Sequence, residues 1–337
     1  MKIPGLQPLA RDRFFHLLLL IGAGLSLFVP FAPQAWPAAI DWRTIITLSG
    51  LMMLTKGVEL SGYFDVLGRK MVRRFATERR LSLFMVFSAA VLSTFLTNDV
   101  ALFIIVPLTL TLRKLCEIPV SRLIIFEALA VNAGSLLTPI GNPQNILLWG
   151  RSGLSFAAFT WQMAPLALVM MLSLLAVCWF AFPDKKLQYH SGTTGPQWQP
   201  RLVWSCLGLY IVFLFALELK YEVAGVLLVA AGFVVLARRV LVSVDWTLLL
   251  VFMVMFIDVH LLIQLPVLQN VLHSVSTLSQ PGLWLTAIGL SQFISNVPST
   301  ILLLNYVPPD TLLAWAVNIG GFGLLPGSLA NLIALRM

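Results

Sequence analysis

The stretch VNAGSLLTPIGNPQNILLWG, from Val131 to Gly150, is apolar enough to cross a membrane yet rich in side chains that prefer water. It contains three asparagines, a glutamine, two prolines and three glycines. An unsatisfied backbone group in lipid costs several kcal/mol, so a broken helix is tolerated only where it faces protein or a watery cavity. The pattern therefore predicts a helix break that lines a polar site.

The residues around the break predict its form. Thr138 precedes a proline, and a residue in that position is pushed out of helical conformation. Gly141 permits a turn that other residues cannot make, and Asn142 followed by Pro143 is typical of a helix N-terminus. We expect a short helix over 143–150 whose partly positive N-terminus lies inside the membrane. The helix before the break should end in free carbonyls, which suit a cation.

Two further motifs place an amide just before an apolar helix, and we expect each at the tip of a hairpin. They are Thr97-Asn98-Asp99 and Ser295-Asn296-Val297-Pro298. A charge near the middle of a membrane is costly and by default marks an ion or proton path. Asp99 therefore either titrates or neutralises a bound sodium ion, unless its hairpin tip is exposed to cytoplasmic water. Glu127 lies about one turn inside its predicted helix, and an interfacial position and a functional one both stay open.

The composition predicts an all-α polytopic membrane protein. The chain has 337 residues, of which 59% are hydrophobic and 11% charged, whereas soluble domains carry about 25% charged residues. Apolar runs long enough to cross a hydrocarbon core of about 30 Å recur along the whole length. The net charge of +8 fits Lys and Arg concentrated in cytoplasmic loops. We therefore expect the protein to lie in a lipid bilayer and to bind no nucleic acid. The three cysteines have no metal-like or redox spacing, so we expect no cofactor apart from a candidate sodium ion.

The distribution of Lys and Arg predicts the topology. Ten apolar segments are expected, at about 14–33, 42–63, 81–112, 121–150, 163–183, 202–219, 223–240, 246–263, 281–306 and 310–335. If the segments 81–112 and 281–306 each form a hairpin that returns to the same side of the membrane, the main basic groups all lie on one side of the membrane. These groups include Lys2, Arg11 and Arg13 at the start, Arg69–Arg80 and Arg336 at the end. The positive-inside rule then predicts both termini in the cytoplasm and a multi-pass protein of the plasma membrane, expected to be a bacterial inner membrane. Asp258 and His260 should lie near the outer surface.

The chain also contains an internal repeat. DWRTIITLSGLMML resembles DWTLLLVFMVMFID, STFLTNDVALFI resembles SQFISNVPSTIL, and VNAGSLLTPIGNPQNIL aligns without a gap on VNIGGFGLLPGSLANLI. In the expected topology the two repeats are inverted, as in many secondary transporters. We therefore expect a first repeat over 1–183, a cytoplasmic linker over 184–201 and a second repeat over 202–337. The second repeat has no counterpart of 163–183, so either this branch is short or the chain is truncated.

These motifs resemble the ion-transporter superfamily over almost the whole chain. It includes arsenite permeases, sodium/proton antiporters and divalent anion:sodium symporters with a citrate-transporter-like domain. In the symporters, Ser-Asn-Thr tips and Gly-x-Pro-x-Asn loops form the sodium and substrate sites. The resemblance implies candidate sodium ligands at Asn98, Asn142, Ser295 and Asn296, and a homodimer. The complete set of candidate binding residues is Thr97, Asn98, Asp99, Asn132, Thr138, Gly141, Asn142, Pro143, Asn145, Ser295, Asn296, Asn318, Gly327, Ser328 and Asn331.

The function expected from these residues is secondary active transport of a small anion, coupled to protons or sodium. Asp99 and Val297 stand where the symporters have tip threonines, which help to hold the carboxylates of the substrate. This difference argues against a dicarboxylate substrate and favours coupling to protons. A sodium/proton antiporter and an arsenite-type efflux permease stay open as alternatives. An enzyme is not expected, because the sequence has neither a pair of intramembrane acids nor a Gly-x-Ser-x-Gly motif with a deep histidine. A passive channel has less need of two inverted repeats.

Overall fold

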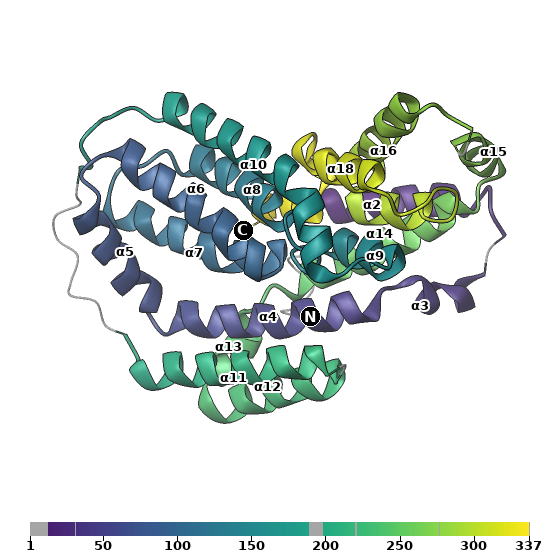
Figure 1. The fold of residues 1–337 in the computed structure, drawn as a ribbon. Coiled ribbons are helices and arrows are strands. Elements are labelled where there is room, and N and C mark those ends of the chain that lie inside the picture. The colour runs from purple at the N-terminus through teal and green to yellow at the C-terminus, as the bar shows by residue number, and fades with distance from the viewer. Residues whose placement is uncertain (1–12, 31, 189–197, 220, 276, 337) are drawn as a thin grey trace. The chain divides into compact units, whose positions relative to one another are not determined.

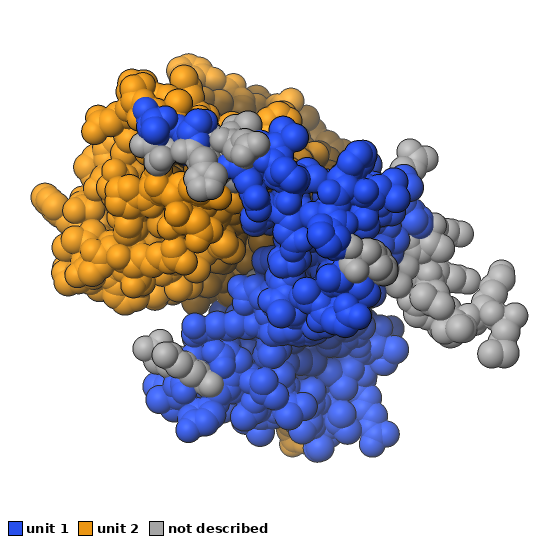
Figure 2. Space-filling model, turned by 90° about the vertical axis from the view of Figure 1, so that its right-hand side faces the viewer, with its two compact units in different colours: residues 1–57, 205–277 blue, residues 58–204, 278–337 orange. Residues whose placement is uncertain are grey.

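A computed structural model describes residues 13–30, 32–188, 198–219, 221–275 and 277–336, and within these ranges it is helical without a strand (Figure 1). This confirms the all-α prediction. Lys2, Arg11 and residues 189–197 of the expected linker lie outside the described residues. The chain forms two compact units, unit 1 from residues 1–57 and 205–277 and unit 2 from 58–204 and 278–337 (Figure 2). Each unit therefore combines segments from both halves of the chain.

Unit 1 is built mainly from α2 (Arg13–Leu25), η1 (Pro33–Ala35), α3 (Trp36–Ala39), α4 (Trp42–Leu60), α11 (Pro200–Glu218), α12 (Glu222–Leu236), α13 (Arg238–Ser243), α14 (Trp246–Ile263) and α15 (Pro266–Val275). Glycines allow its helices to pack closely. A Cβ atom on Gly50 would lie 2.3 Å from Phe213 Cζ, and one on Gly57 would lie 2.7 Å from the Phe233 ring. Both phenylalanines are fully buried, so α4 receives aromatic rings of α11 and α12 on its glycine face.

Unit 2 contains α5 (Tyr63–Arg74), α6 (Glu78–Phe95), α7 (Asn98–Leu115), α8 (Val120–Ser135), α9 (Pro143–Ser152), α10 (Phe156–Ala181), α16 (Gln280–Ile294), α17 (Asn296–Leu303), α18 (Thr311–Ile319), η2 (Gly320–Phe322), η3 (Leu325–Gly327) and α19 (Leu329–Arg336). Helix α8 packs along α6 and α7, and α10 covers both α6 and α8 (Figure 1). Helices α16, α17 and α18 pack together in the same way, while α19 packs on α7 and α8.

The helix boundaries support the sequence-based reading of the polar motifs. Segment 81–112 forms two helices, α6 and α7, which only Leu96 and Thr97 separate. Helices α16 and α17 meet at Ser295, and the long segment 121–150 is broken between α8 and α9. The prediction that Asn142 caps the second piece is confirmed, because its side chain accepts a hydrogen bond from the Asn145 N–H at 2.9 Å. This piece, α9, extends to Ser152, beyond the predicted 143–150.

One other prediction about the helices was wrong, and two helices were not predicted. The basic region after the second apolar segment forms a helix, α5, whose Phe64 and Met71 are buried. Segment 223–240 is two helices, α12 and α13, because the backbone leaves helical conformation at Ala237. Residues 266–275, expected outside any apolar segment, form α15. A search for apolar runs of about 20 residues overlooks short amphipathic helices such as α5.

Among the residues that the structure describes, three helices suit a complete membrane crossing by length and composition: α10, α14 and α11 over Pro200–Leu217. Helices α2, α12 and α18 contribute shorter apolar stretches. The expected count of eight crossings stays a prediction.

Replacing Gly134 with Ala should destabilise unit 2, because a Cβ there would lie 2.0 Å from the Ala90 carbonyl oxygen. The backbone of α6 cannot move without breaking its packing, so we expect a loss of about 1–3 kcal/mol, measured as a lower thermal midpoint in detergent. Gly150, in helix α9, is the matched control, since a Cβ there meets nothing within 4 Å. Equal midpoints for the two variants would contradict this account of the α6–α8 contact.

Candidate functional site

The break between α8 and α9 is held together by the side chain of Asn145. Its Nδ2 donates to the carbonyl oxygens of Leu136 at 3.0 Å and Thr138 at 2.9 Å. A helix normally leaves its last carbonyls without partners. Here a side chain of the following helix, Asn145, supplies the hydrogen-bond donor. The expectation of free carbonyls after α8 was therefore wrong for these two positions. Gly141 is required in the turn, since a Cβ there would lie 2.1 Å from the Ser135 carbonyl oxygen.

Asn318, near the end of α18, connects to the start of α9. Its Oδ1 accepts from Asn142 Nδ2 at 3.0 Å and from Gln144 Nε2 at 3.3 Å. Its Nδ2 donates to Asn145 Oδ1 at 2.8 Å and to the Ala314 carbonyl at 2.8 Å. All four polar side chains are buried, so α18 fixes the N-terminus of α9 through amide groups alone.

Asn132, near the end of α8, makes the corresponding contacts to the second break. Its Nδ2 donates to Asn331 Oδ1 at 2.9 Å and to the Gly321 carbonyl at 3.2 Å. Its Oδ1 accepts from Ser328 Oγ at 3.1 Å. Asn331 Nδ2 also donates to the Gly321 carbonyl at 2.9 Å, which holds the second break as Asn145 holds the first. Ser135 Oγ connects the contacts around Asn142 with those around Asn132, since it accepts from Asn142 and donates to the Asn132 carbonyl. We call these connected side chains the amide network.

The amide network is reciprocal with respect to the internal alignment. Asn132 aligns with Asn318, Asn142 with Ser328, and Asn145 with Asn331. Asn318 bonds Asn142 and Asn145, and Asn132 bonds Ser328 and Asn331. Each of these asparagines thus has at least one hydrogen-bond partner in the other half of the chain.

The same correspondence extends to the helices beside the breaks. Thr94 Oγ1 donates to the Gly134 carbonyl at 3.1 Å, and Gln292 Nε2 donates to the aligned Gly320 carbonyl at 2.6 Å. Thr138 Oγ1 in turn donates to the Thr94 carbonyl at 2.8 Å. A Cβ on Gly327 would lie 2.5 Å from the Gly320 carbonyl oxygen, so the second break is as tightly folded as the first.

The first helix tip joins the amide network through its backbone. The Asn98 N–H donates to the Gly141 carbonyl at 2.9 Å, and Asn98 Oδ1 accepts from the Asp99 N–H at 3.0 Å. Thr97 is the N-cap residue of α7, although its side chain makes no capping bond. Asp99 is 4% exposed, and its Oδ1 has no hydrogen-bond partner among the described residues. The alternative of a water-exposed Asp99 was therefore wrong.

The second helix tip lies beside the network without a direct bond to it among the described contacts. Ser295 has φ 73°, a conformation that costs a non-glycine residue about 1–3 kcal/mol and is common at functional sites. Ser295 Oγ donates to Asn296 Oδ1 at 3.4 Å, and both residues are buried. Asn296 Nδ2 lies 3.2 Å from the position of a Cβ on Gly321. The candidate sodium ligands thus form two pairs, Asn98 and Asn142 at Gly141, and Ser295 and Asn296 near Gly321.

Some residues of the site were not predicted. Ser135 links the halves of the network, and Gln144 reaches Asn318 while its Oε1 has no partner among the described residues. Gln292 accepts the Leu324 N–H at 2.6 Å and so braces the second break. Each is a polar residue within a motif already recognised, and its polarity inside an apolar run was the signal.

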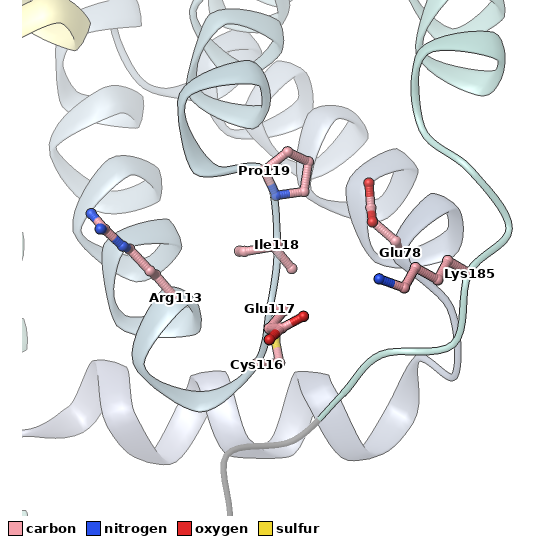
Figure 3. Close-up of a pocket in the computed structure, with 7 residues that line it drawn as sticks. All are labelled: Glu78, Arg113, Cys116, Glu117, Ile118, Pro119 and Lys185. Atoms are coloured by element: carbon pink, nitrogen blue, oxygen red, sulfur yellow. The ribbon is translucent and has the colours of Figure 1, made fainter.

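A hollow of about 350 Å³ lies away from the network, at the polar ends of α6, α7 and α8, lined by Glu78, Arg113, Cys116, Glu117, Ile118, Pro119 and Lys185 (Figure 3). Burial raises the pKa of the Glu78 carboxyl, while Arg122 and Lys185 oppose the shift. Lys185 belongs to the expected linker, and its carbonyl accepts the Glu78 N–H at 2.9 Å. The start of the linker is thus fastened to unit 2.

Comparison with known proteins identifies the chain as a transporter. The citrate transporter family model, CitMHS, matches residues 13–308. The inner membrane protein YbiR of Escherichia coli is 79% identical over 337 residues, covering 100% of this chain and 91% of that protein. A protein of Methanocaldococcus jannaschii named as an uncharacterized transporter is 31% identical over 97% of this chain and 90% of its own length. A transporter of Dictyostelium discoideum named arsB is 28% identical over 42% of this chain and 25% of that protein.

These matches confirm the resemblance that the sequence motifs had indicated, and they agree with an apolar, helical membrane protein. The chain belongs to the CitMHS family of citrate transporters.

Proposed function

We propose that this protein is a secondary active carrier of a small anion, coupled to protons or sodium. The observation that carries the proposal is the buried amide network, where two helix breaks meet two helix tips inside unit 2. Amide and hydroxyl groups both donate and accept hydrogen bonds, so such a site serves a hydrated or partly dehydrated ion of either sign.

The reciprocal bonding supports two inverted-topology repeats. If two repeats are related by a pseudo-two-fold axis, a contact from the first to the second should recur from the second to the first. Asn132 and Asn318 have this relation. Thr94 and Gln292 bond their aligned glycine carbonyls within their own repeats, which supports equivalent folding of the two repeats. We extend the proposal to helix pairs α6–α7 and α16–α17 as re-entrant hairpins, and to the repeats 1–183 and 202–337 with linker 184–201.

The charges around the network fit a coupled carrier. The N-termini of α9 and α19 carry partial positive charge, which favours an anion. Asp99 adds a carboxylate with one oxygen that has no partner in the described part of the chain, which favours a cation or a proton. In such a carrier the substrate and the coupling ion share one site, and alternating access moves part of the protein across it.

Two alternatives to the anion carrier stay open. In a sodium/proton antiporter, Asp99 would exchange the two cations and no anion would bind. An arsenite-type efflux permease would carry a mostly neutral solute and would need no strong anion site. The partial match to a relative named arsB favours keeping the second alternative, whereas the family description favours a carboxylate such as citrate. No catalytic activity is part of any of these proposals.

We place the protein in the bacterial inner membrane as a multi-pass protein with both termini in the cytoplasm. The relative named as an inner membrane protein supports the location, and the positive-inside pattern supports the orientation. A homodimer is proposed on the family resemblance.

The test is transport into liposomes that contain purified protein and a pH-sensitive dye. Sodium is added first, followed by a panel of citrate, other carboxylates, phosphate and arsenite, under an imposed pH gradient. Proton movement or accumulation of solute that requires one particular anion would support the anion carrier. Proton movement triggered by sodium alone would replace it with the antiporter. Solute that moves but never accumulates against its concentration gradient would indicate a channel.

A further inference from the structure

Glu127 is a buried carboxylic acid outside the amide network. It lies in the middle of α8 and is 0% exposed. Thr109 Oγ1, on α7, donates to Glu127 Oε1 at 2.5 Å, and Thr109 is also fully buried. The second oxygen, Oε2, has no hydrogen-bond partner among the described residues. Half of this carboxyl group is therefore unsatisfied.

No counter-charge reaches Glu127 from the elements around it. Helix α8 packs against α6, α7, α10, α19 and η2. The charged or titratable residues on these elements, and on α8 itself, are Glu78, Arg79, Arg80, Asp99, Arg113, Lys114, Arg122, Cys178 and Arg336. None of their described side chains forms a hydrogen bond or ion pair with Glu127. An ionised carboxylate is strongly disfavoured in such a place.

Packing alone does not require an acid at this position. Extending the ungapped alignment of the two breaks backwards places ALAVNAG, residues 128–134, on AWAVNIG, residues 314–320. The residue before the first stretch is Glu127 and the residue before the second is Leu313, and both are 0% exposed. The second half of the fold therefore fills the corresponding site with an apolar side chain.

We propose that Glu127 is a proton-binding site of this carrier, separate from Asp99. Thr109, the hydrogen-bond partner of Glu127, lies ten positions after Asp99 in α7, which corresponds to about 15 Å along the helix. In the conformation described, Glu127 holds its proton. In a second conformation that admits water, the carboxyl O–H bond breaks, the proton passes to water, and the Thr109 hydroxyl continues to donate to the carboxylate. The release of the proton rests on the proposed carrier function, whereas its binding does not.

The binding step is tested by infrared spectroscopy of the whole protein in lipid, recorded while the pH is stepped from acidic to alkaline. Wild type should display a protonated-carboxyl band that is absent in Glu127→Gln and retained in the exposed-acid control Glu117→Gln and in Asp99→Asn. Persistence of the full band in Glu127→Gln would overturn the proposal. Glu127→Leu copies the second repeat and should also lack the band, with a thermal midpoint near that of wild type. If Glu127→Leu instead fails to fold while Glu127→Gln folds, the acid is structural and the proposal is wrong.

The release step is tested in liposomes with the same variants. Glu127→Gln should lose flux driven by a pH gradient while keeping exchange of solute at equilibrium, because exchange needs no net proton movement. Proton-driven flux equal to wild type would overturn the release step. If wild type itself moves no solute or proton with any member of the panel, the carrier function fails, and the infrared result still decides whether Glu127 binds a proton.

Discussion

The Asp99→Asn variant is expected to lose coupled transport by about 10–100-fold. The substitution keeps the shape of the side chain and the backbone bond from Asn98 to Gly141, but it removes the only carboxylate at the first helix tip. Charge-assisted contacts are each worth about 1.5–3 kcal/mol, and about 1.4 kcal/mol corresponds to a factor of ten in binding. Initial rates of proton and solute movement in liposomes measure the effect.

The control for this variant is Glu117→Gln, which neutralises an exposed acid at the polar end of unit 2. Its rates should match wild type, so any loss in Asp99→Asn cannot reflect overall charge. Coupled transport that persists at the wild-type rate in Asp99→Asn would remove Asp99 from the site and leave the amide network as the sole candidate.

The variants Asn318→Ala and Asn132→Ala are expected to have equal and large effects on stability. Asn318→Ala leaves Asn145 Oδ1 and Gln144 Nε2 without their partner. Asn132→Ala leaves Asn331 Oδ1 without its partner and the Ser328 hydroxyl without its acceptor. Each buried polar group left unsatisfied costs about 1–3 kcal/mol. The thermal midpoint in detergent should therefore fall clearly in both. Asn305→Ala, at an exposed asparagine of the same unit, should stay within about 0.5 kcal/mol of wild type.

Reciprocity itself is tested by a double-mutant cycle. Asn142→Ala combined with Asn318→Ala should be coupled by about 0.5–3 kcal/mol, because the two side chains share a hydrogen bond of 3.0 Å. Asn142→Ala combined with Asn331→Ala should be coupled less strongly, since no hydrogen bond joins this pair directly among the described contacts. Coupling in the second pair and none in the first would mean that the two breaks are paired differently.

The sequence predicted features that depend on local chemistry. Asn142 and Pro143 were identified as a helix start because capping involves only neighbouring residues. The alignment of the two halves also singled out Asn132 and Asn318. It did not predict that each bonds the other half, because hydrogen-bond partners almost 200 positions apart depend on how helices cross.

Burial of acids could not be read from the sequence. Asp258 is 6% exposed, because α2 passes beside it at Gly22, which has no side chain to keep the helices apart. Its expected position near the outer surface of the membrane stays a prediction. Glu127 was left undecided between an interfacial and a functional position. Its depth follows from the elements packed around α8, which are α6, α7, α10, α19 and η2, and no pattern within α8 indicates their presence.

The exchange of partners between the two breaks has a consequence for synthesis. When residues 132–145 enter the membrane, Asn132, Asn142 and Asn145 lack the partners that residues 318–331 supply later. Lipid offers no substitutes for those partners, so the first break must stay in water, in the translocon or in a provisional fold until they arrive. Assembly of unit 2 is thus postponed until residues 318–331 have been synthesised.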